Sequence, residues 1–179
     1  MFPVKRVAGS SATLLGLVLA LLGPGACGYR PVHGGEQPSR LSLVAAPALA
    51  PDAEATGAAL SGARAELGRE GVLGSPTGYP RLVIELVRVD AEAAAISARG
   101  DQPLGRGTRI TVVVRGWVED SAGASPSRVT GDLRRAVVTL EGAGSAEAAA
   151  LRRNAARRAG EAAGRAVARH VLGIPTARD

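Results

Sequence analysis

Two stretches decide the fold: residues 81–89 (RLVIELVRV) and residues 109–118 (RITVVVRGWV). Both are rich in β-branched residues, which favour strands. The second stretch alternates cleanly, so that one face takes Ile110, Val112, Val114 and Val118 and the other takes Arg109, Thr111, Arg115 and Trp117. Such a strand is covered by helices on one side and exposed on the other. The connector at residues 97–107 contains glycine and proline, and it predicts that the two strands form a long hairpin.

A short strand and a helix are predicted before the hairpin. Residues 41–44 (LSLV) form a short apolar run that is typical of a strand. A helix is expected after Asp52, closing near Gly74 and Pro76. Its narrow, alanine-rich face is predicted from the helical spacing of Leu60, Ala63, Leu67 and Gly71.

One more strand and a long helix are predicted after the hairpin. Residues 133–140 (LRRAVVTL) read as a strand, and residues 146–172 read as an alanine- and arginine-rich helix that stops before Pro175. The apolar stripe of this helix consists of Leu151, Ala155, Ala159, Ala163, Val167 and Val171. The order strand, helix, strand, strand, strand, helix predicts an α+β fold, with two helices packed on one face of a roughly four-stranded mixed or antiparallel sheet.

The amino terminus has the layout of a secretory signal. Lys5 and Arg6 form a positive region, residues 14–22 (LLGLVLALL) form an apolar region, and small residues precede Cys27. The apolar run is shorter than the roughly 20 residues that span a membrane as a helix. We therefore predict a signal peptide over residues 1–26, a lipidated tether over 27–40, a single α+β domain over 41–174 and a C-terminal tail over 175–179.

Cys27 is the only cysteine of the chain and the predicted lipidation site. Its position directly behind the signal is where a lipoprotein signal peptidase would leave a new, acylated amino terminus, and a lone thiol cannot form an internal disulfide. Acyl chains hold a protein on a bilayer at about 0.8 kcal/mol per buried CH₂. The alternative is a free thiol beyond an ordinary cleavage site, because Pro24 stands where bacterial lipoboxes usually have Leu. Gly28 follows the cysteine, where an Asp often retains lipoproteins at the inner membrane, so the resemblance to bacterial lipoproteins implies the outer membrane.

The charge balance is basic but mild. The chain has 22 Lys+Arg against 16 Asp+Glu, and removal of Lys5 and Arg6 with the signal leaves 20 against 16, a net charge of +4. Nucleic-acid binding is not indicated, because it needs clustered charge among aromatic residues, which make up 2% of this chain. Six arginines in residues 146–172 read as a solvated helix face, or alternatively as a basic surface for lipid phosphate or for the acidic wall of a partner.

No catalytic, cofactor or metal site is predicted. His33 and His170 are far apart, with no acid and nucleophile at a motif spacing, and the one cysteine is assigned to lipidation. Residues 105–107 (GRG) are an incomplete phosphate-loop pattern. Two carboxylate pairs read more simply as strand ends, namely Asp90 with Glu92 and Glu119 with Asp120.

The segment ACGYRP at residues 26–31, the strand containing Gly116 and Trp117, and the order of the elements resemble the LptE family of lipopolysaccharide-assembly lipoproteins. This resemblance implies a non-enzymatic outer-membrane lipoprotein that faces the periplasm. It implies that the protein plugs the β-barrel translocon LptD, assists barrel assembly and binds lipopolysaccharide. We choose Arg109 and Arg115 as candidate ligands of lipopolysaccharide phosphates, because alternation puts them on one polar face; ordinary exposed strand arginines are the competing interpretation. The alternative function is an auxiliary periplasmic lipoprotein of another envelope transport system.

Overall fold

A computed structural model describes residues 39–47, 52–99, 102–141 and 143–175. The predicted signal peptide over residues 1–26, the lipidation site Cys27 and the tether up to residue 38 lie outside the described residues. Within the part that is described, no helix is long and apolar enough to cross a membrane.

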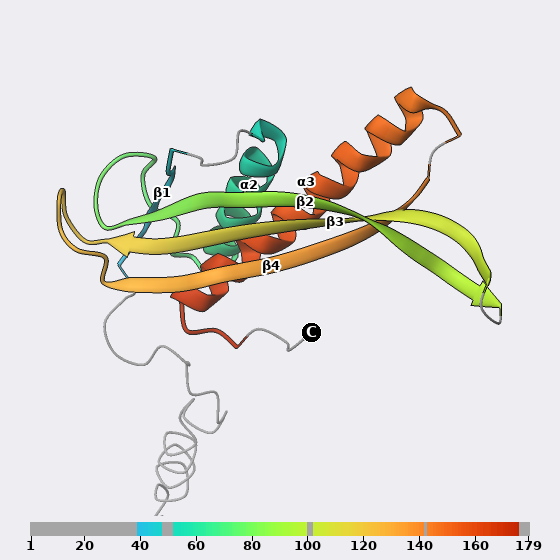
Figure 1. Cartoon of the computed structure of the whole chain (residues 1–179). Coiled ribbons are helices and arrows are strands. Elements are labelled where there is room, and N and C mark those ends of the chain that lie inside the picture. The colour runs from blue at the N-terminus through green and yellow to red at the C-terminus, as the bar shows by residue number, and fades with distance from the viewer. Residues whose placement is uncertain (1–38, 48–51, 100–101, 142, 176–179) are drawn as a thin grey trace, which may run out of the picture. The chain divides into compact units, whose positions relative to one another are not determined.

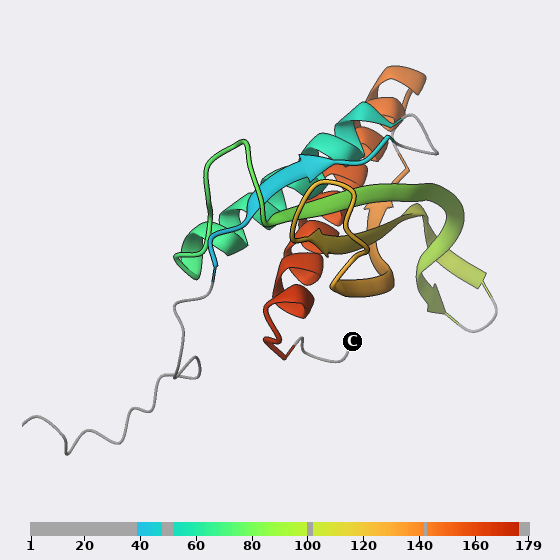
Figure 2. The ribbon, with the colours of Figure 1, turned by 90° about the vertical axis from the view of Figure 1, so that its left-hand side faces the viewer.

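The described residues form a mixed sheet backed by two helices (Figure 1). The elements are β1 (Ser42–Ala45), α2 (Ala53–Arg69), β2 (Arg81–Arg99), β3 (Gln102–Glu119), β4 (Arg128–Leu140) and α3 (Ser145–Val171). The sheet order is β1-β2-β3-β4, with β1 parallel to β2 and the remaining neighbours antiparallel. Both helices lie on the same side of the sheet (Figure 2). The predicted α+β fold is therefore confirmed.

The core lies between the helices and one face of the sheet. Helix α2 packs over β1 and β2, while α3 packs over β3 and β4. The strands contribute alternate side chains to this core, which are Leu82, Ile84, Leu86, Val112, Val114 and Val118. Each buried side chain of this size contributes about 1.5–3 kcal/mol. The face predicted for residues 109–118 is confirmed, since Ile110 is also buried, in a second cluster beneath Ala155 and Ala156 of α3.

The hairpin strands are longer than the sequence predicted. The prediction of a connector at residues 97–107 is wrong for most of its length, because β2 continues to Arg99 and β3 starts at Gln102. Backbone pairing continues past the apolar segments, and register shifts between Ala95 and Ala98 absorb the irregular residues. Because β4 ends opposite Gly107, the hairpin extends beyond β4, as Figure 1 shows.

Helix α2 begins as predicted but ends earlier. The Asp52 side chain accepts a hydrogen bond from the Ala55 backbone N–H at 2.8 Å, which is a standard N-cap. The helix ends at Arg69, because Gly71 takes a left-handed conformation with φ of 70°. Gly71 therefore lies beyond the helix and not on its apolar face, and the predicted end near Gly74 is wrong.

Helices α2 and α3 approach each other through glycines. A Cβ added at Gly160 would lie 2.8 Å from the backbone oxygen of Ala55, and one added at Gly62 or Gly164 would collide with the backbone oxygens of Glu161 and Ala59, respectively. The backbones therefore touch directly, without intervening side chains. Five of the six residues predicted for the α3 stripe are buried; Leu151, near the start of the helix, is partly exposed.

Candidate functional site

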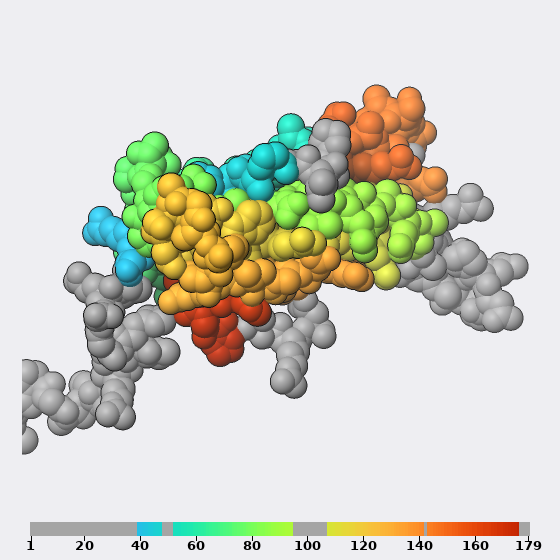
Figure 3. Space-filling view, turned by 60° about the vertical axis from the view of Figure 1, so that its left-hand side comes forward, coloured from blue at the N-terminus to red at the C-terminus, as the bar shows by residue number. Residues whose placement is uncertain are grey.

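No described helix or strand covers the side of the sheet opposite the helices, and we call this side the open face; Val83 and Val113 on it are buried among its other side chains. In the space-filling view β2, β3 and β4 run side by side across the surface, with the end of α3 at their lower edge (Figure 3). Because directly opposed residues in neighbouring strands share a face, the register defines its members. They are Arg81, Val83, Glu85, Arg88, Asp90 and Glu92 of β2, Arg109, Thr111, Val113, Arg115, Trp117 and Glu119 of β3, and Val129, Asp132, Arg134, Ala136, Val138 and Leu140 of β4.

Arg115 lies at the middle of the open face between two carboxylates. Its Nη2 is 3.0 Å from Oδ1 of Asp132 on β4, and its Nη1 is 3.9 Å from Oε2 of Glu85 on β2. The three residues face one another across three strands, so the ion pairs follow directly from the register. A guanidinium held in this way is already neutralised by its neighbours.

Glu119 accepts hydrogen bonds from two neighbours at one end of the open face. The Trp117 indole N–H donates to Oε1 at 2.9 Å, and Arg81 donates to Oε2 at 2.7 Å. The indole hydrogen bond and then the Arg81 guanidinium lower the pKa of the Glu119 carboxyl below its ordinary value. Arg81 also lies over the ring of Tyr79, 4.7 Å from its centroid. This end of the face is a closed polar network.

Arg109 lies at the other end of the open face, and it is exposed. It stands opposite Glu92 on β2 and Val138 on β4. No ion pair or hydrogen bond of its side chain occurs among the residues that the structure describes. Beside it, Val138 is 45% exposed and Leu140 is 64% exposed, so an unpaired cation here borders an apolar surface.

The two arginines chosen from the sequence, Arg109 and Arg115, therefore differ in their ion pairing. The structure places both on one face of β3, as strand alternation predicted, but Arg115 is ion-paired and Arg109 is not. Sequence reasoning did not identify the Arg115 partners Glu85 and Asp132, because they become neighbours only through the strand register. The exposed apolar residues Val138 and Leu140 were also missed, since their strand reads as ordinary alternation.

The charges of the open face cancel. Among its described side chains, five arginines stand against five carboxylates, namely Arg81, Arg88, Arg109, Arg115 and Arg134 against Glu85, Asp90, Glu92, Glu119 and Asp132. Balanced charges that pair within the face leave a polar, nearly neutral surface. Such a surface is complementary to a polar, nearly neutral protein surface and not to a highly charged ligand.

Residues that could carry catalysis are not brought together. Asp90 pairs with Arg88 at 2.8 Å, and Glu119 is engaged as described above. His170 is exposed at the end of α3, and His33 lies outside the described residues. Within the described part of the chain, no group of three or more His, Cys, Asp or Glu side chains could hold a metal ion.

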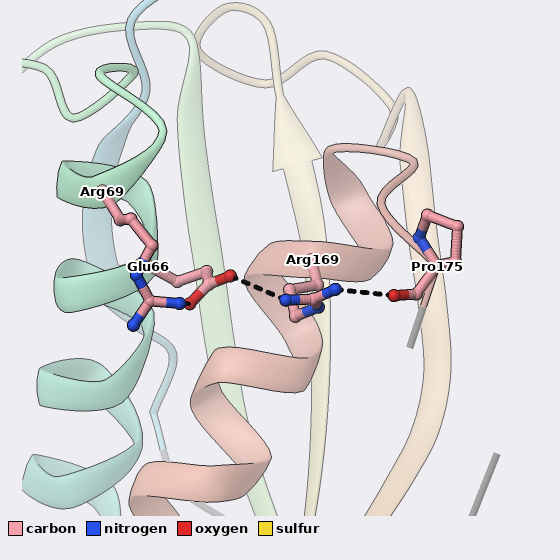
Figure 4. Close-up of polar contacts among 4 residues, drawn as sticks. All are labelled: Glu66, Arg69, Arg169 and Pro175. Carbon is pink, nitrogen blue, oxygen red and sulfur yellow. Dashed lines mark hydrogen bonds and ion pairs between the residues drawn. The ribbon is translucent and has the colours of Figure 1, made fainter. Parts of the chain in front are cut away.

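A buried ion pair joins the two helices. Glu66 of α2 is fully buried, and its carboxylate lies 2.8 Å from Arg69 Nη1 and 3.3 Å from Arg169 Nη1 (Figure 4). The Nη2 atom of Arg169 donates a hydrogen bond to the backbone oxygen of Pro175 at 2.7 Å. The pair therefore fixes α2, the end of α3 and the residues after it. The alanine-rich pattern gave no sign of it, because Glu66 and Arg169 are 103 positions apart.

Comparisons with known proteins give loose structural similarity only. The sequence matches no protein-family model and no curated protein. A solved structure of a Caulobacter crescentus CB15 protein, assigned as a lipoprotein, is 14% identical with a TM-score of 0.46, covering 70% of this chain and 86% of that one. A minor lipoprotein from Acinetobacter baumannii is 12% identical with a TM-score of 0.45, covering 79% of this chain and all of that one. Similarity at this level assigns no function.

Proposed function

We propose that this protein is an outer-membrane lipoprotein, anchored through Cys27 and facing the periplasm, that docks into an LptD-like β-barrel and assists lipopolysaccharide transport and barrel assembly. The role is non-enzymatic. The amino-terminal signal, Cys27 and the ACGYRP segment support the anchor and the family assignment. The alternative, an auxiliary lipoprotein of another envelope transport system, shares the anchor and differs in the partner.

The open face is the observation that carries the proposal. It is a three-strand surface that the chain's own helices leave uncovered, and seven of its ten charged side chains form ion pairs with one another. The lumen of a large outer-membrane barrel is polar. A surface on which most charges are paired can enter such a lumen at a lower cost than one whose charges are all unpaired, because burying each unpaired charge costs several kcal/mol.

A bulky substitution on the open face tests whether this face docks into the barrel. Ala136 is an exposed residue of β4 at the middle of this face, and Ser61 is an exposed residue of α2 on the opposite side of the molecule. We expect Ala136→Trp to reduce recovery of the β-barrel in an affinity pull-down from outer-membrane extract, while Ser61→Trp leaves recovery unchanged. The Cys27→Ala variant controls for the anchor.

The identity of the captured partner decides between the two functions. Stoichiometric recovery of the lipopolysaccharide translocon barrel supports the proposal. Recovery of an inner-membrane ATPase complex in place of a barrel would refute it and favour the auxiliary role. Equal capture by Ala136→Trp and wild-type protein would reject the open face as the docking surface.

Lipopolysaccharide binding is expected to depend on Arg109 more than on Arg115. Lysine keeps the charge but loses the planar fork that binds phosphate with two hydrogen bonds. Arg109→Lys should weaken binding of purified lipopolysaccharide about fivefold, corresponding to one lost hydrogen bond of about 1 kcal/mol. Arg115→Lys should leave binding within about twofold, because Arg115 is already engaged by Asp132 and Glu85. An equal loss in both variants would contradict this distinction.

A further inference from the structure

The positive charge of this protein is concentrated on α3. This helix has six arginines against two glutamates, a net charge of +4 before His170 is counted. The open face, by contrast, has equal numbers of arginines and carboxylates among its described side chains. The molecule therefore has one charge-balanced surface and one basic surface.

Three of the α3 arginines lie on the side of the helix away from its packed stripe. Ala159 and Ala163 are buried, and an added Cβ at Gly160 or Gly164 would meet α2, so the remaining sector of the helix faces solvent. At 100° per residue, this sector contains Arg158 and Arg165, with Arg157 at its edge, and we call these three residues the arginine face. Arg157 and Arg158 are exposed and Arg165 is half-buried.

The arginine face is largely free of counter-charges. Arg157 pairs with Glu161 at 3.4 Å. In the described part of the chain, Arg158 and Arg165 have no ion pair or side-chain hydrogen bond. From Arg157 to Arg165 the face extends over 8 positions, or about 12 Å along the helix. Two unpaired guanidinium groups are therefore presented together on one side of the helix.

We propose that the arginine face binds the phosphate groups of an anionic phospholipid bilayer. Guanidinium matches phosphate geometry with paired hydrogen bonds. A protein partner is disfavoured, because stable protein interfaces centre on large apolar or aromatic anchors, and the other residues on this side of the helix are Ala150, Asn154, Glu161 and Ala162. Nucleic acid is disfavoured because α3 has no aromatic residue on which bases could stack.

The inference does not depend on a barrel partner. It is consistent with a lipid anchor, because Cys27 and the first described residue, Ser39, are 12 positions apart, at most about 40 Å of chain. A domain held within that distance of a bilayer would meet headgroups at high effective concentration. Each basic residue close to an anionic surface then strengthens binding about fivefold.

Vesicle co-sedimentation tests this surface. The full chain with Cys27→Ala, which removes acylation, is mixed with phosphatidylcholine vesicles with or without phosphatidylglycerol. We expect partitioning to favour the anionic vesicles. The double variant Arg158→Gln/Arg165→Gln should reduce that preference about 25-fold, or fivefold per arginine. The matched variant Arg64→Gln/Arg134→Gln removes the same charge from exposed positions of α2 and β4, and it should change the preference less than about twofold.

The outcomes separate a specific surface from general electrostatics. The substituted arginines have no partners in the described structure, so circular dichroism should show wild-type unfolding for both variants. Loss confined to the α3 variant supports the proposal. Equal partitioning of the wild type to both vesicle types, or an equal loss in the two double variants, would overturn it. Capture of an acidic protein without any preference for anionic vesicles would also overturn it.

Discussion

Replacing Gly160 with alanine tests the close packing of α2 and α3. The new Cβ would lie 2.8 Å from the Ala55 backbone oxygen and 3.1 Å from the Ala58 Cβ, whereas ordinary contact begins at 3.4 Å. The helices must therefore separate by about 0.6 Å, the difference between 3.4 and 2.8 Å. A gap of that order forfeits a quarter to a half of the dispersion energy of the atoms that it parts.

The expected magnitude follows from two opposing effects. Overpacking costs about 2 kcal/mol, while alanine in place of glycine stabilises a helix by about 1 kcal/mol. Gly160→Ala should therefore lower the free energy of unfolding by about 1 kcal/mol, which lowers Tm by about 3–5 °C. Gly164→Ala should cost more, because its Cβ would collide with the Ala59 backbone oxygen at closer range.

Gly57→Ala is the matched control, because an added Cβ there meets nothing within 4 Å. It should stabilise the protein by about 0.5–1 kcal/mol. Urea unfolding of the full chain, followed by far-ultraviolet circular dichroism, measures all three variants. From the most to the least stable, the predicted order is Gly57→Ala, wild type, Gly160→Ala and Gly164→Ala. If Gly164→Ala proved as stable as wild type, the direct backbone contact between the helices would be refuted.

Two further predictions concern the ion pairs. Glu66→Ala should lower the free energy of unfolding by about 2–4 kcal/mol, because it leaves the partly buried Arg169 without its carboxylate partner. The control is Glu70→Ala at an exposed position nearby, which should change the free energy of unfolding in urea by less than about 0.5 kcal/mol. Equal effects of the two variants would rule out a structural role for the buried pair. The lowered pKa of Glu119 means that its stabilising contribution is complete above the unfolded value near 4.5 and is lost as pH falls through the folded value. Wild type should therefore be more stable than Glu119→Gln at neutral pH, with a difference that shrinks in acid, as measured by urea unfolding with Trp117 fluorescence; a constant difference at all pH values would contradict the shift.

Local patterns predicted much of the fold. Alternation in residues 109–118 identified which face of β3 turns toward the helices, and the helical spacing of Ala155 to Val171 identified the buried stripe of α3. Both patterns show which side chains are buried on folding, and this periodicity can be read from residues that are close together in the sequence. The length of the hairpin was not predictable in the same way, because strands beyond the core are held by backbone pairing and not by apolar side chains.

The candidate site was predicted only in part. Alternation placed Arg109 and Arg115 on one face, since that requires only the strand period. It could not distinguish the ion-paired Arg115 from the unpaired Arg109, because Asp132 and Glu85 are brought to Arg115 by the register of three strands. The arginine-rich composition of α3 was visible in the sequence, but which arginines face solvent depends on where α2 packs.

The sequence by itself determined the element order, the α+β class and the face of each long element that is buried, because these follow from side-chain periodicity within a single segment. Tertiary structure alone decided the glycine contacts between the helices, the Glu66–Arg169 pair and the charge balance of the open face. Each of these joins residues on different elements, separated by 103 positions in the case of Glu66 and Arg169. Partners so distant are selected by packing and strand register, which no local pattern encodes.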